Sequence, residues 1–211
     1  GGTDLTLPPT LEHGVLEVRD KDGNWATTVK NPEEAFPYKF KLLRHILNTR
    51  NEGESTLVFV HKKSSSTKQL LEELRYADID AELLSGTRRV QKRNMITWQL
   101  MEGDGRVVVA TDELAARGLD YESVSMVINF DLPYGVKNYL HRAGRAGRAG
   151  RSGTVISMVS NPKELRFLRE KLFGRLGVER EMNVIVKKSE ISQSEDTEDH
   201  QGLNETEIIF E

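Results

Sequence analysis

The sequence predicts an α/β domain in which helices cover both faces of a mainly parallel β-sheet. Short apolar runs, such as TLVFV at residues 56–60 and VVVA at residues 107–110, do not alternate with polar residues, and strands of this kind are buried on both faces. Helical patterns separate these runs along the chain, which is the order expected of parallel strands. At 211 residues, 37% of them hydrophobic, the chain is long enough to bury one substantial core. We therefore expect a single three-layer domain with tails.

Hydrophobic spacing assigns the individual elements of this domain. The helix at residues 162–176 is the clearest, because Pro162 suits a first helical turn, leucines recur along one face, and Gly177 suits the helix end. The other helices follow from apolar residues at intervals of three and four. The expected strands are 56–60, 81–84, 107–110, 125–130 and 154–159, and the expected helices are 64–76, 90–101, 136–145 and 162–176.

The two ends of the chain differ from this core. Residues 15–29 have an Asp22-Gly23 pair between β-rich flanks, which predicts an N-terminal β-hairpin added to the sheet. Residues 188–211 hold one basic and eight acidic residues, so this tail has a net charge of −7 and the rest of the chain about +4. The predicted divisions are a linker at 1–9, the α/β domain at 10–180 and a largely disordered, acidic extension at 181–211. The apolar tripeptide at 208–210 is either a docking element or a remnant, and the sequence favours the remnant.

Composition excludes several classes of site. The absence of cysteine excludes disulfides, thiol catalysis and cysteine-ligated metals, and it fits a reducing compartment inside the cell, although the organelle stays open. No apolar run is long enough for a membrane segment, and the five histidines lack metal-ligand spacing. Trp98 falls inside a helical pattern and is expected in the core. The aromatic residues that could stack on bases are Trp25, Tyr121, Tyr134 and Tyr139.

The arginine-rich stretch at residues 141–150, HRAGRAGRAG, is the sharpest chemical feature of the sequence. Arg142, Arg145 and Arg148 recur every third residue, and the chain from 132 to 163 has no acidic residue. A guanidinium is a permanently charged, forked donor that suits phosphate, and glycine lets a polyanion approach the backbone. The stretch predicts phosphate handling. The alternatives are a basic loop that binds nucleic acid loosely and one whose arginines pair with carboxylates.

Two motifs in a fixed order point to a known family. TDELAARGLD at residues 111–120 follows the predicted strand at 107–110, and YLHRAGRAGR at residues 139–148 comes about 20 residues later. Together with VFVHKK at residues 58–63, this set resembles the second RecA-like domain of DEAD-box RNA helicases over residues 10–176. The resemblance implies a RecA-like three-layer fold and, for the full-length protein, an ATP-dependent RNA helicase.

The resemblance also implies roles in ATP handling. Arg145 and Arg148 match two arginine fingers, catalytic residues that reach the γ-phosphate of ATP bound by a partner RecA-like domain. His141 matches a catalytic residue that couples the two domains in the closed state. Gly118 and Asp120 match positions that contact the ATP ribose, and Arg117 and Arg142 match supporting positions.

The RNA contacts implied by the resemblance lie mostly earlier in the chain. They are His61, Lys62, Gly86, Arg93 and Thr111. Phe59, in the same run as His61, is expected to pack in the core instead. The chain departs from the family pattern in three ways near these positions. Five residues rather than four separate Thr111 from Arg117, and Glu113 adds a negative charge near the RNA path. Val90 stands where the family usually has a glutamine, three residues before Arg93, which removes one polar contact.

Two phosphate and magnesium motifs are absent from the sequence. It has neither a G-x-x-x-x-G-K-[ST] loop nor a D-E-A-D segment. The resemblance therefore implies that ATP and Mg²⁺ are held mainly by an upstream RecA-like domain of the same protein, and that this domain alone is inactive. The implied partners are RNA, that upstream domain, and a protein at the N-terminal hairpin or the acidic tail, with no membrane partner.

A second class of function stays open. The chain could serve as a weakly active or inactive assembly factor, or as an RNA clamp in a ribonucleoprotein. Glu113 inside the altered motif favours that alternative, whereas the two predicted arginine fingers oppose it. A helicase-related DNA translocase is disfavoured by His141-Arg142.

Overall fold

The computed structural model describes residues 6–28, 31–62, 66–86, 89–102, 105–115, 124–147, 152–188 and 206–210. Its strands are β1 (Leu11–Glu17), β2 (Ser55–Phe59), β3 (Ala81–Leu84), β4 (Val107–Ala110), β5 (Val124–Asn129), β6 (Gly153–Val159), β7 (Glu181–Lys188) and β8 (Thr206–Phe210). Its helices are α1 (Phe36–Thr49), α2 (Ser66–Tyr76), α3 (Val90–Met101), α4 (Asp112–Ala115), α5 (Val136–Ala143), α6 (Pro162–Arg166), η2 (Phe167–Phe173) and α7 (Gly174–Leu176), and a short turn η1 (Pro32–Ala35) precedes α1.

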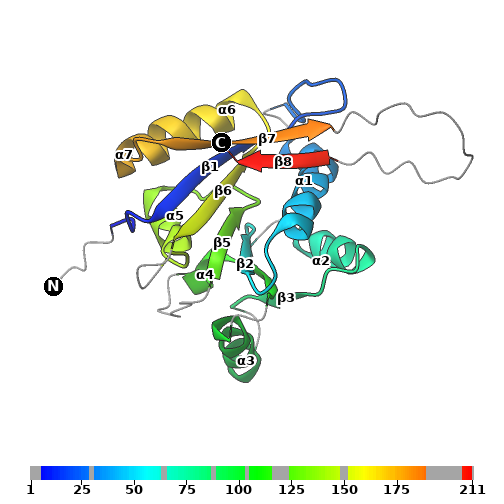
Figure 1. Cartoon of the computed structure of the whole chain (residues 1–211), viewed down its shortest axis with the longest axis vertical. Helices are drawn as coiled ribbons and strands as arrows, with labels where there is room; N and C mark the ends of the chain where they lie inside the picture. The colour runs from blue at the N-terminus through cyan, green and yellow to red at the C-terminus, as the bar shows by residue number, and fades with distance from the viewer. Residues whose placement is uncertain are drawn as a thin grey trace, which may run out of the picture.

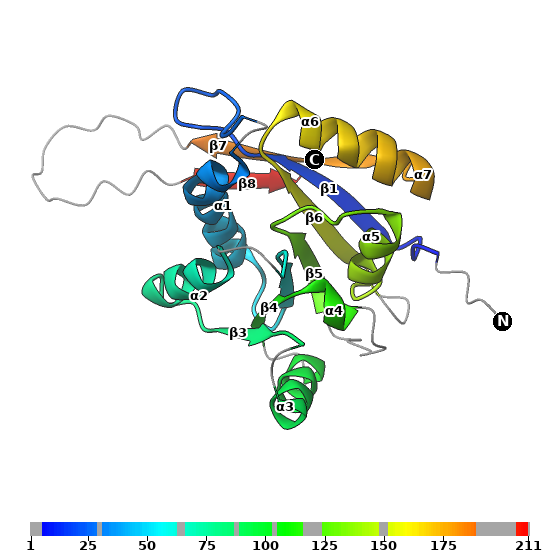
Figure 2. The same ribbon diagram turned by 180° about the vertical axis from the view of Figure 1, so that it is seen from behind.

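These strands form one sheet in the order β3-β4-β2-β5-β6-β1-β7-β8. The pairs from β3 to β7 are parallel, and β8 runs antiparallel to β7. The chain passes from β2 towards β3 and later returns past β2 to β5, so the strand order reverses between β2 and β5. Figures 1 and 2 show helices on both sides of the sheet, which confirms the predicted three-layer α/β fold. Among the described helices, none is long and apolar enough to cross a membrane.

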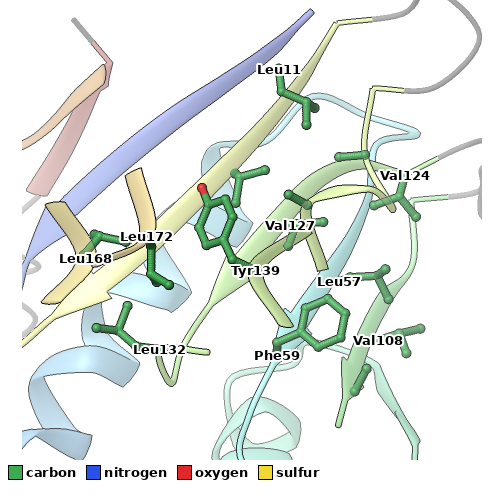
Figure 3. Close-up of a cluster of buried hydrophobic side chains, with 14 of the residues drawn as sticks. Leu11, Leu57, Phe59, Val108, Val124, Val127, Leu132, Tyr139, Leu168 and Leu172 are labelled. Carbon is green, nitrogen blue, oxygen red and sulfur yellow. The ribbon is translucent and has the colours of Figure 1, made fainter. Parts of the chain in front are cut away.

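Two hydrophobic cores lie on the opposite faces of the sheet. Successive residues of a strand point to opposite faces, so Leu57 and Phe59 of β2 pack towards α3, α5 and the helix formed by α6, η2 and α7. Figure 3 shows this core, with Tyr139 of α5 at its centre. Val58 and Val60 pack on the other face, against α1 and α2. All five residues of β2 are buried, as its unbroken apolar pattern predicts.

The predicted elements are confirmed with small changes at their ends. The helix predicted at 162–176 is continuous as α6, η2 and α7. Its start is capped by Asn161, whose side chain accepts a hydrogen bond from the Glu164 amide at 2.9 Å, and Gly177 ends it with a φ of 68°. Sequence reasoning missed α1, although its buried leucines and isoleucine have helical spacing, because Pro37 and the buried Lys39 shorten the apolar pattern at its start.

The predicted hairpin at 15–29 is present in a shorter form. Its first residues belong to β1, and the turn that follows closes with a single antiparallel bridge between Arg19 and Trp25. The Arg19 guanidinium lies 4.2 Å from the centre of the Trp25 ring, a cation–π contact. Trp25 therefore packs between this loop and the hydrophobic core.

Two parts of the predicted disordered extension at 181–211 are strands. β7 joins the sheet beside β1, and β8 pairs with β7 so that Ile185 lies opposite Ile209. The tripeptide at 208–210 is thus a docking element on the edge of the sheet, and the expectation that it is a remnant is wrong. The acidic residues between these strands lie outside the described residues.

Candidate functional site

The carboxyl ends of the parallel strands form one rim of the sheet, and the loops that leave them carry the candidate site. Backbone hydrogen bonds join neighbouring strand ends: the Val60 amide donates to the Ala110 carbonyl at 3.0 Å, and the Thr111 amide donates to the Leu84 carbonyl at 3.3 Å. In open parallel sheets, ligands bind at this rim, where the strand order reverses. The residues that follow β2, β3, β4 and β5 are therefore candidates for a common site.

Arg142, on α5, is the largest side chain that the fold buries completely. Its Nε and Nη2 donate to the two carboxylate oxygens of Asp112 at 2.6 and 2.8 Å, and its Nη1 donates to Asn129 Oδ1 at 3.1 Å and to the Asp131 carbonyl at 2.6 Å. The Phe59 ring lies 5.1 Å from the guanidinium carbon. A buried charge is tolerated only with such complete pairing. We call these five residues the Arg142 cluster, and it joins α5 to α4 and to the ends of β2 and β5.

The last turn of α5 and the turn after it bring two predicted catalytic residues close to this cluster. His141 is half-buried, and burial together with the charges of Lys137 and Arg145 lowers its pKa, against an opposing effect of Asp112. Arg145 is only 5% exposed and interacts with neighbouring groups, so its side chain lies inside the domain. Arg148 lies outside the described residues. Of the three arginines, Arg142 pairs with a carboxylate, that of Asp112. For Arg142, the alternative in which the arginines pair with carboxylates is therefore confirmed.

The glycines of the arginine-rich stretch permit close packing against the sheet. Gly147 has a φ of 64°, which disfavours any residue with a side chain. A Cβ atom placed on Gly153, at the start of β6, would lie 2.5 Å from the Gly147 amide nitrogen. The backbone of the stretch therefore touches β6 at a point where only glycine fits.

A polar cluster lies where the strand order reverses, beside a cavity of about 330 Å³. The Asp131 carboxylate accepts hydrogen bonds from the His61 amide at 2.9 Å and from the Lys39 ammonium at 3.4 Å, and Lys39 also donates to the Phe130 carbonyl at 2.7 Å. The His61 ring stacks on the Tyr134 ring with centres 4.2 Å apart. Tyr134 is exposed on its other side, so the pair presents an aromatic surface to solvent.

Lys62, Gly86 and Glu113 meet further along the rim. The Lys62 ammonium donates to one carboxylate oxygen of Glu113. The other oxygen of that carboxylate lies beside Gly86, where it would collide with any Cβ atom. We call these three residues the Lys62 rim. Two predicted RNA contacts are thus brought together, with an acidic side chain between them.

The other predicted RNA contacts lie on the elements next to this rim. Thr111 follows β4 and is 3% exposed, and its hydroxyl has no hydrogen-bond partner within the part of the chain that the structure describes. Arg93 lies in the first turn of α3 and is partly exposed. Arg117, Gly118 and Asp120, which were predicted for ribose contact and support, lie outside the described residues, as Arg148 does.

Aromatic residues divide between the core and the surface in a way that the sequence predicts only in part. Phe59 is 2% exposed, which confirms its place in the core, and Tyr139 is 1% exposed and therefore cannot stack on a base. The prediction that Trp98 is a core residue is wrong, because 61% of it is exposed. Ile96 and Leu100 form the buried side of α3. A helix at the end of the sheet buries only this narrow stripe.

Sequence reasoning missed three polar residues that organise the site: Lys39, Asn129 and Asp131. Asn129 and Asp131 flank the aromatic residue that ends an apolar run, and a polar residue at the carboxyl end of a buried strand is a signal that could have identified them. Lys39 gives no such signal, since a lysine within an amphipathic helix is usually exposed. Within the described ranges, no three histidine, aspartate or glutamate side chains come together as a metal site.

Comparison with known families agrees with this geometry. The helicase conserved C-terminal domain family matches residues 38–150, which is more than half of the chain. The chain belongs to this family. As a helicase C-terminal domain it is 42% identical over 122 residues to the ATP-dependent RNA helicase SrmB of Haemophilus influenzae, a match that covers 58% of this chain and 27% of SrmB. The chain therefore spans less than a third of the length of that relative.

Solved structures place this helicase C-terminal domain in the DEAD-box group. S. cerevisiae Dbp5 bound to RNA and ADP BeF3 aligns with a TM-score of 0.66 at 25% identity, over 84% of this chain and 42% of that chain. E. coli DEAD-box protein SrmB bound to regulator of ribonuclease activity A aligns with a TM-score of 0.56 at 36% identity, over 80% of this chain and 82% of that chain. The fold is thus the C-terminal RecA-like domain of a DEAD-box helicase, as the two motifs predict.

Proposed function

We propose that this helicase C-terminal domain forms half of an RNA-dependent ATPase, and that a first RecA-like domain supplies the other half and holds most of the ATP and its Mg²⁺. The observation that carries the proposal is the ion pair between Arg142 and Asp112, which are 30 residues apart in the sequence. It joins the two family motifs into one structural unit. The names of the relatives, ATP-dependent RNA helicases, support the same activity.

In this proposal, Arg145 and Arg148 reach the γ-phosphate when the two domains close around ATP. Their charges stabilise the negative charge that develops on the transferring phosphoryl group. Because Arg145 is buried in the single domain, its side chain has to turn outwards on closure, a conformational step of the kind that often limits turnover. Asp120 and Gly118 are proposed to contact the ribose. Burial favours the neutral form of His141 by lowering its pKa, and a neutral imidazole can accept or donate a hydrogen bond across the interface between the domains.

The RNA surface in this proposal is the rim formed by the loops after β2, β3 and β4, together with the start of α3. His61, Lys62, Gly86, Thr111 and Arg93 are proposed to bind the RNA backbone. Contacts to phosphate and ribose carry little sequence information, so we expect weak preference among RNA sequences.

A protein partner is a further part of the proposal. The E. coli DEAD-box protein SrmB is a precedent, since its structure is of a complex with regulator of ribonuclease activity A. The loop closed by the Arg19–Trp25 bridge and the acidic tail are the surfaces we propose for such a partner.

The test is ATP hydrolysis by this chain joined to a first RecA-like domain, measured with and without RNA. Replacing both Arg145 and Arg148 with alanine should lower RNA-stimulated kcat by about 10³-fold or more, by analogy with other arginine fingers, and should leave RNA affinity nearly unchanged. The matched control is the double replacement of Arg166 and Arg175, two exposed arginines on the helix from Pro162 to Leu176. It removes the same charge and should leave kcat unchanged.

The alternative function predicts a different result. An RNA clamp or assembly factor should bind RNA with little or no turnover, and the arginine variants should then behave like the control. Equal kcat in the Arg145/Arg148 variant and in the wild type would remove the proposed role of these two residues. The isolated chain, without the first domain, is expected to show no ATPase activity in either case.

A further inference from the structure

The Lys62 rim contains an acidic side chain between two predicted RNA contacts. β4 lies between β3 and β2 in the sheet, so Glu113, which follows β4, lies between Gly86 after β3 and Lys62 after β2. One carboxylate oxygen accepts a hydrogen bond from the Lys62 ammonium, and the other takes the space next to the Gly86 backbone. Glu113 therefore occupies both of these predicted RNA contacts at once.

A lysine ammonium beside an open glycine backbone is a favourable place for an anion. The ammonium supplies charge-assisted hydrogen bonds, and the missing side chain lets a phosphate oxygen come close to the chain. A carboxylate and a phosphate both bring anionic oxygens, so either can fill the same space. The rim is at the carboxyl ends of parallel strands, where open α/β sheets bind ligands.

From this arrangement we infer that Glu113 occupies the position of one backbone phosphate in the RNA-free domain, and that RNA binds by exchanging the carboxylate for a phosphate. The inference rests on the proposed function, since it assigns a residue that tunes RNA binding at the same site. Glu113 is then a specificity-determining residue. It permits binding of ligands whose phosphate can displace it, and it weakens the binding of all other ligands.

The contacts around Glu113 allow this exchange. The side chains of Lys62 and Glu113 are 56% and 37% exposed, and an ion pair so open to water is weak and screened by salt. The preceding residue, Asp112, is held by two hydrogen bonds from the buried Arg142. The start of α4 is therefore fixed, and Glu113 can leave the rim by rotating its own side chain.

Thr111 gives independent support. Its hydroxyl is buried and lacks a hydrogen-bond partner in the described part of the chain, which is unfavourable for a polar group. The hydroxyl lies two residues before Glu113, at the end of β4. Displacement of Glu113 by a phosphate is a movement that can supply that partner.

The experiment compares RNA binding by the wild-type chain and by Glu113→Gln, which keeps the shape of the side chain and removes its charge. Fluorescence anisotropy with a short single-stranded RNA is recorded over a range of salt concentrations. Loss of the competing carboxylate should tighten binding about two- to fivefold, the range expected for one exposed ion pair. It should also steepen the slope of log affinity against log salt by about 0.7, because the uncompensated charge of Lys62 then neutralises one more RNA phosphate and releases the salt cation condensed on it.

Two controls separate this exchange from a general change in charge. Glu17→Gln removes the same charge from another partly exposed ion pair, with Arg19 at 2.9 Å, and should leave the salt slope unchanged. In a Lys62→Gln background, Glu113→Gln should no longer steepen the slope, because the ammonium that it frees is absent. Circular dichroism establishes that each variant is folded.

The outcomes distinguish the inference from the function on which it rests. If the wild type binds RNA, Arg93→Ala weakens that binding and Glu113→Gln leaves the slope unchanged, the exchange is wrong and the RNA-binding function stands. A steeper slope for Glu113→Gln that persists without Lys62 also overturns the exchange. If no variant binds RNA, with or without a first RecA-like domain, both proposals fall.

Discussion

The Arg142 cluster and the Lys62 rim both pair a basic side chain with an acidic residue at the start of α4, yet they differ in almost every other respect. Arg142 is fully buried and meets two carboxylate oxygens, an amide oxygen and a carbonyl. Lys62 is more than half exposed and meets one carboxylate. The two acidic partners, Asp112 and Glu113, are consecutive in the sequence.

This difference separates a structural role from a binding role. A buried, fully paired guanidinium fixes the positions of the elements around it, because any displacement leaves a charge unpaired in the interior. An exposed pair can open at little expense in free energy. The same short helix therefore has one side chain that anchors it and one that is free to exchange partners with a ligand.

The sharpest test of the comparison replaces two arginines that each form a bidentate carboxylate pair. Arg142→Ala should lower the free energy of unfolding by about 3–5 kcal/mol, since it leaves the half-buried Asp112 carboxylate and the buried Asn129 side chain without their partner. Arg169, which pairs with Glu181 at 2.6 Å on the surface, is the matched control, and Arg169→Ala should cost less than about 1 kcal/mol. Urea denaturation measures both. Equal losses would contradict the structural role of the cluster.

The second test uses pH to probe another buried polar contact, between α5 and β1. His13 Nδ1 and the Tyr139 hydroxyl share a hydrogen bond of 2.6 Å, and burial lowers the pKa of His13 to about 4. In the unfolded chain, His13 binds a proton near pH 6.5, whereas in the folded chain it does so only near pH 4. The contribution of the neutral, buried His13 to the free energy of unfolding is therefore complete above about pH 6.5 and is lost as the pH falls towards 4. The expected loss is about 3 kcal/mol.

Two variants separate the cause of this pH dependence. His13→Gln should flatten the slope of unfolding free energy against pH between 4 and 6.5, compared with the wild type. Tyr139→Phe should lower stability by about 1–3 kcal/mol at every pH while it keeps the slope, because burial rather than the hydroxyl depresses the pKa of His13. An unchanged slope in His13→Gln would assign the pH dependence to other groups.

The smallest expected effect concerns the two lysines that face the strand ends. Lys62→Ala should change the free energy of unfolding by no more than about 0.5 kcal/mol, as for other surface residues. The buried ammonium of Lys39 donates to the Phe130 carbonyl at 2.7 Å. Lys39→Ala should therefore lower the free energy of unfolding by about 1–3 kcal/mol. Thermal or urea unfolding of both variants checks the contrast. A large loss in Lys62→Ala would show that the rim supports the fold as well as the ligand.

Much of the fold is predictable from the sequence because it depends on local patterns. A strand buried on both faces has to be apolar throughout, so β2 and β4 are evident as unbroken runs. Pro162 and Gly177 mark the two ends of one helix through their own backbone preferences. The site residues that lie in motifs are predictable as well, because the spacing of Arg142, Arg145 and Arg148 does not depend on packing.

Other features were decided by contacts between distant segments. β7 packs closely beside Gly14 of β1: a Cβ atom there would lie 3.0 Å from side-chain atoms of both Met182 and Val184. The exposure of Trp98 depends on which side of α3 meets the sheet, and the helical pattern alone predicts the opposite.

The contrast between the buried Arg142 and the partly exposed Glu113 shows the same limit. The sequence alone determined the fold class, the order of the main strands and helices, and a stretch of arginines suited to phosphate, since these follow from composition and spacing. Only the tertiary structure decided that Arg142 is a buried clamp on Asp112 and that Glu113 lies between Lys62 and Gly86. The physical reason is that burial and charge pairing depend on which strand ends become neighbours, and the order β3-β4-β2 is a property of the folded sheet rather than of any segment within it.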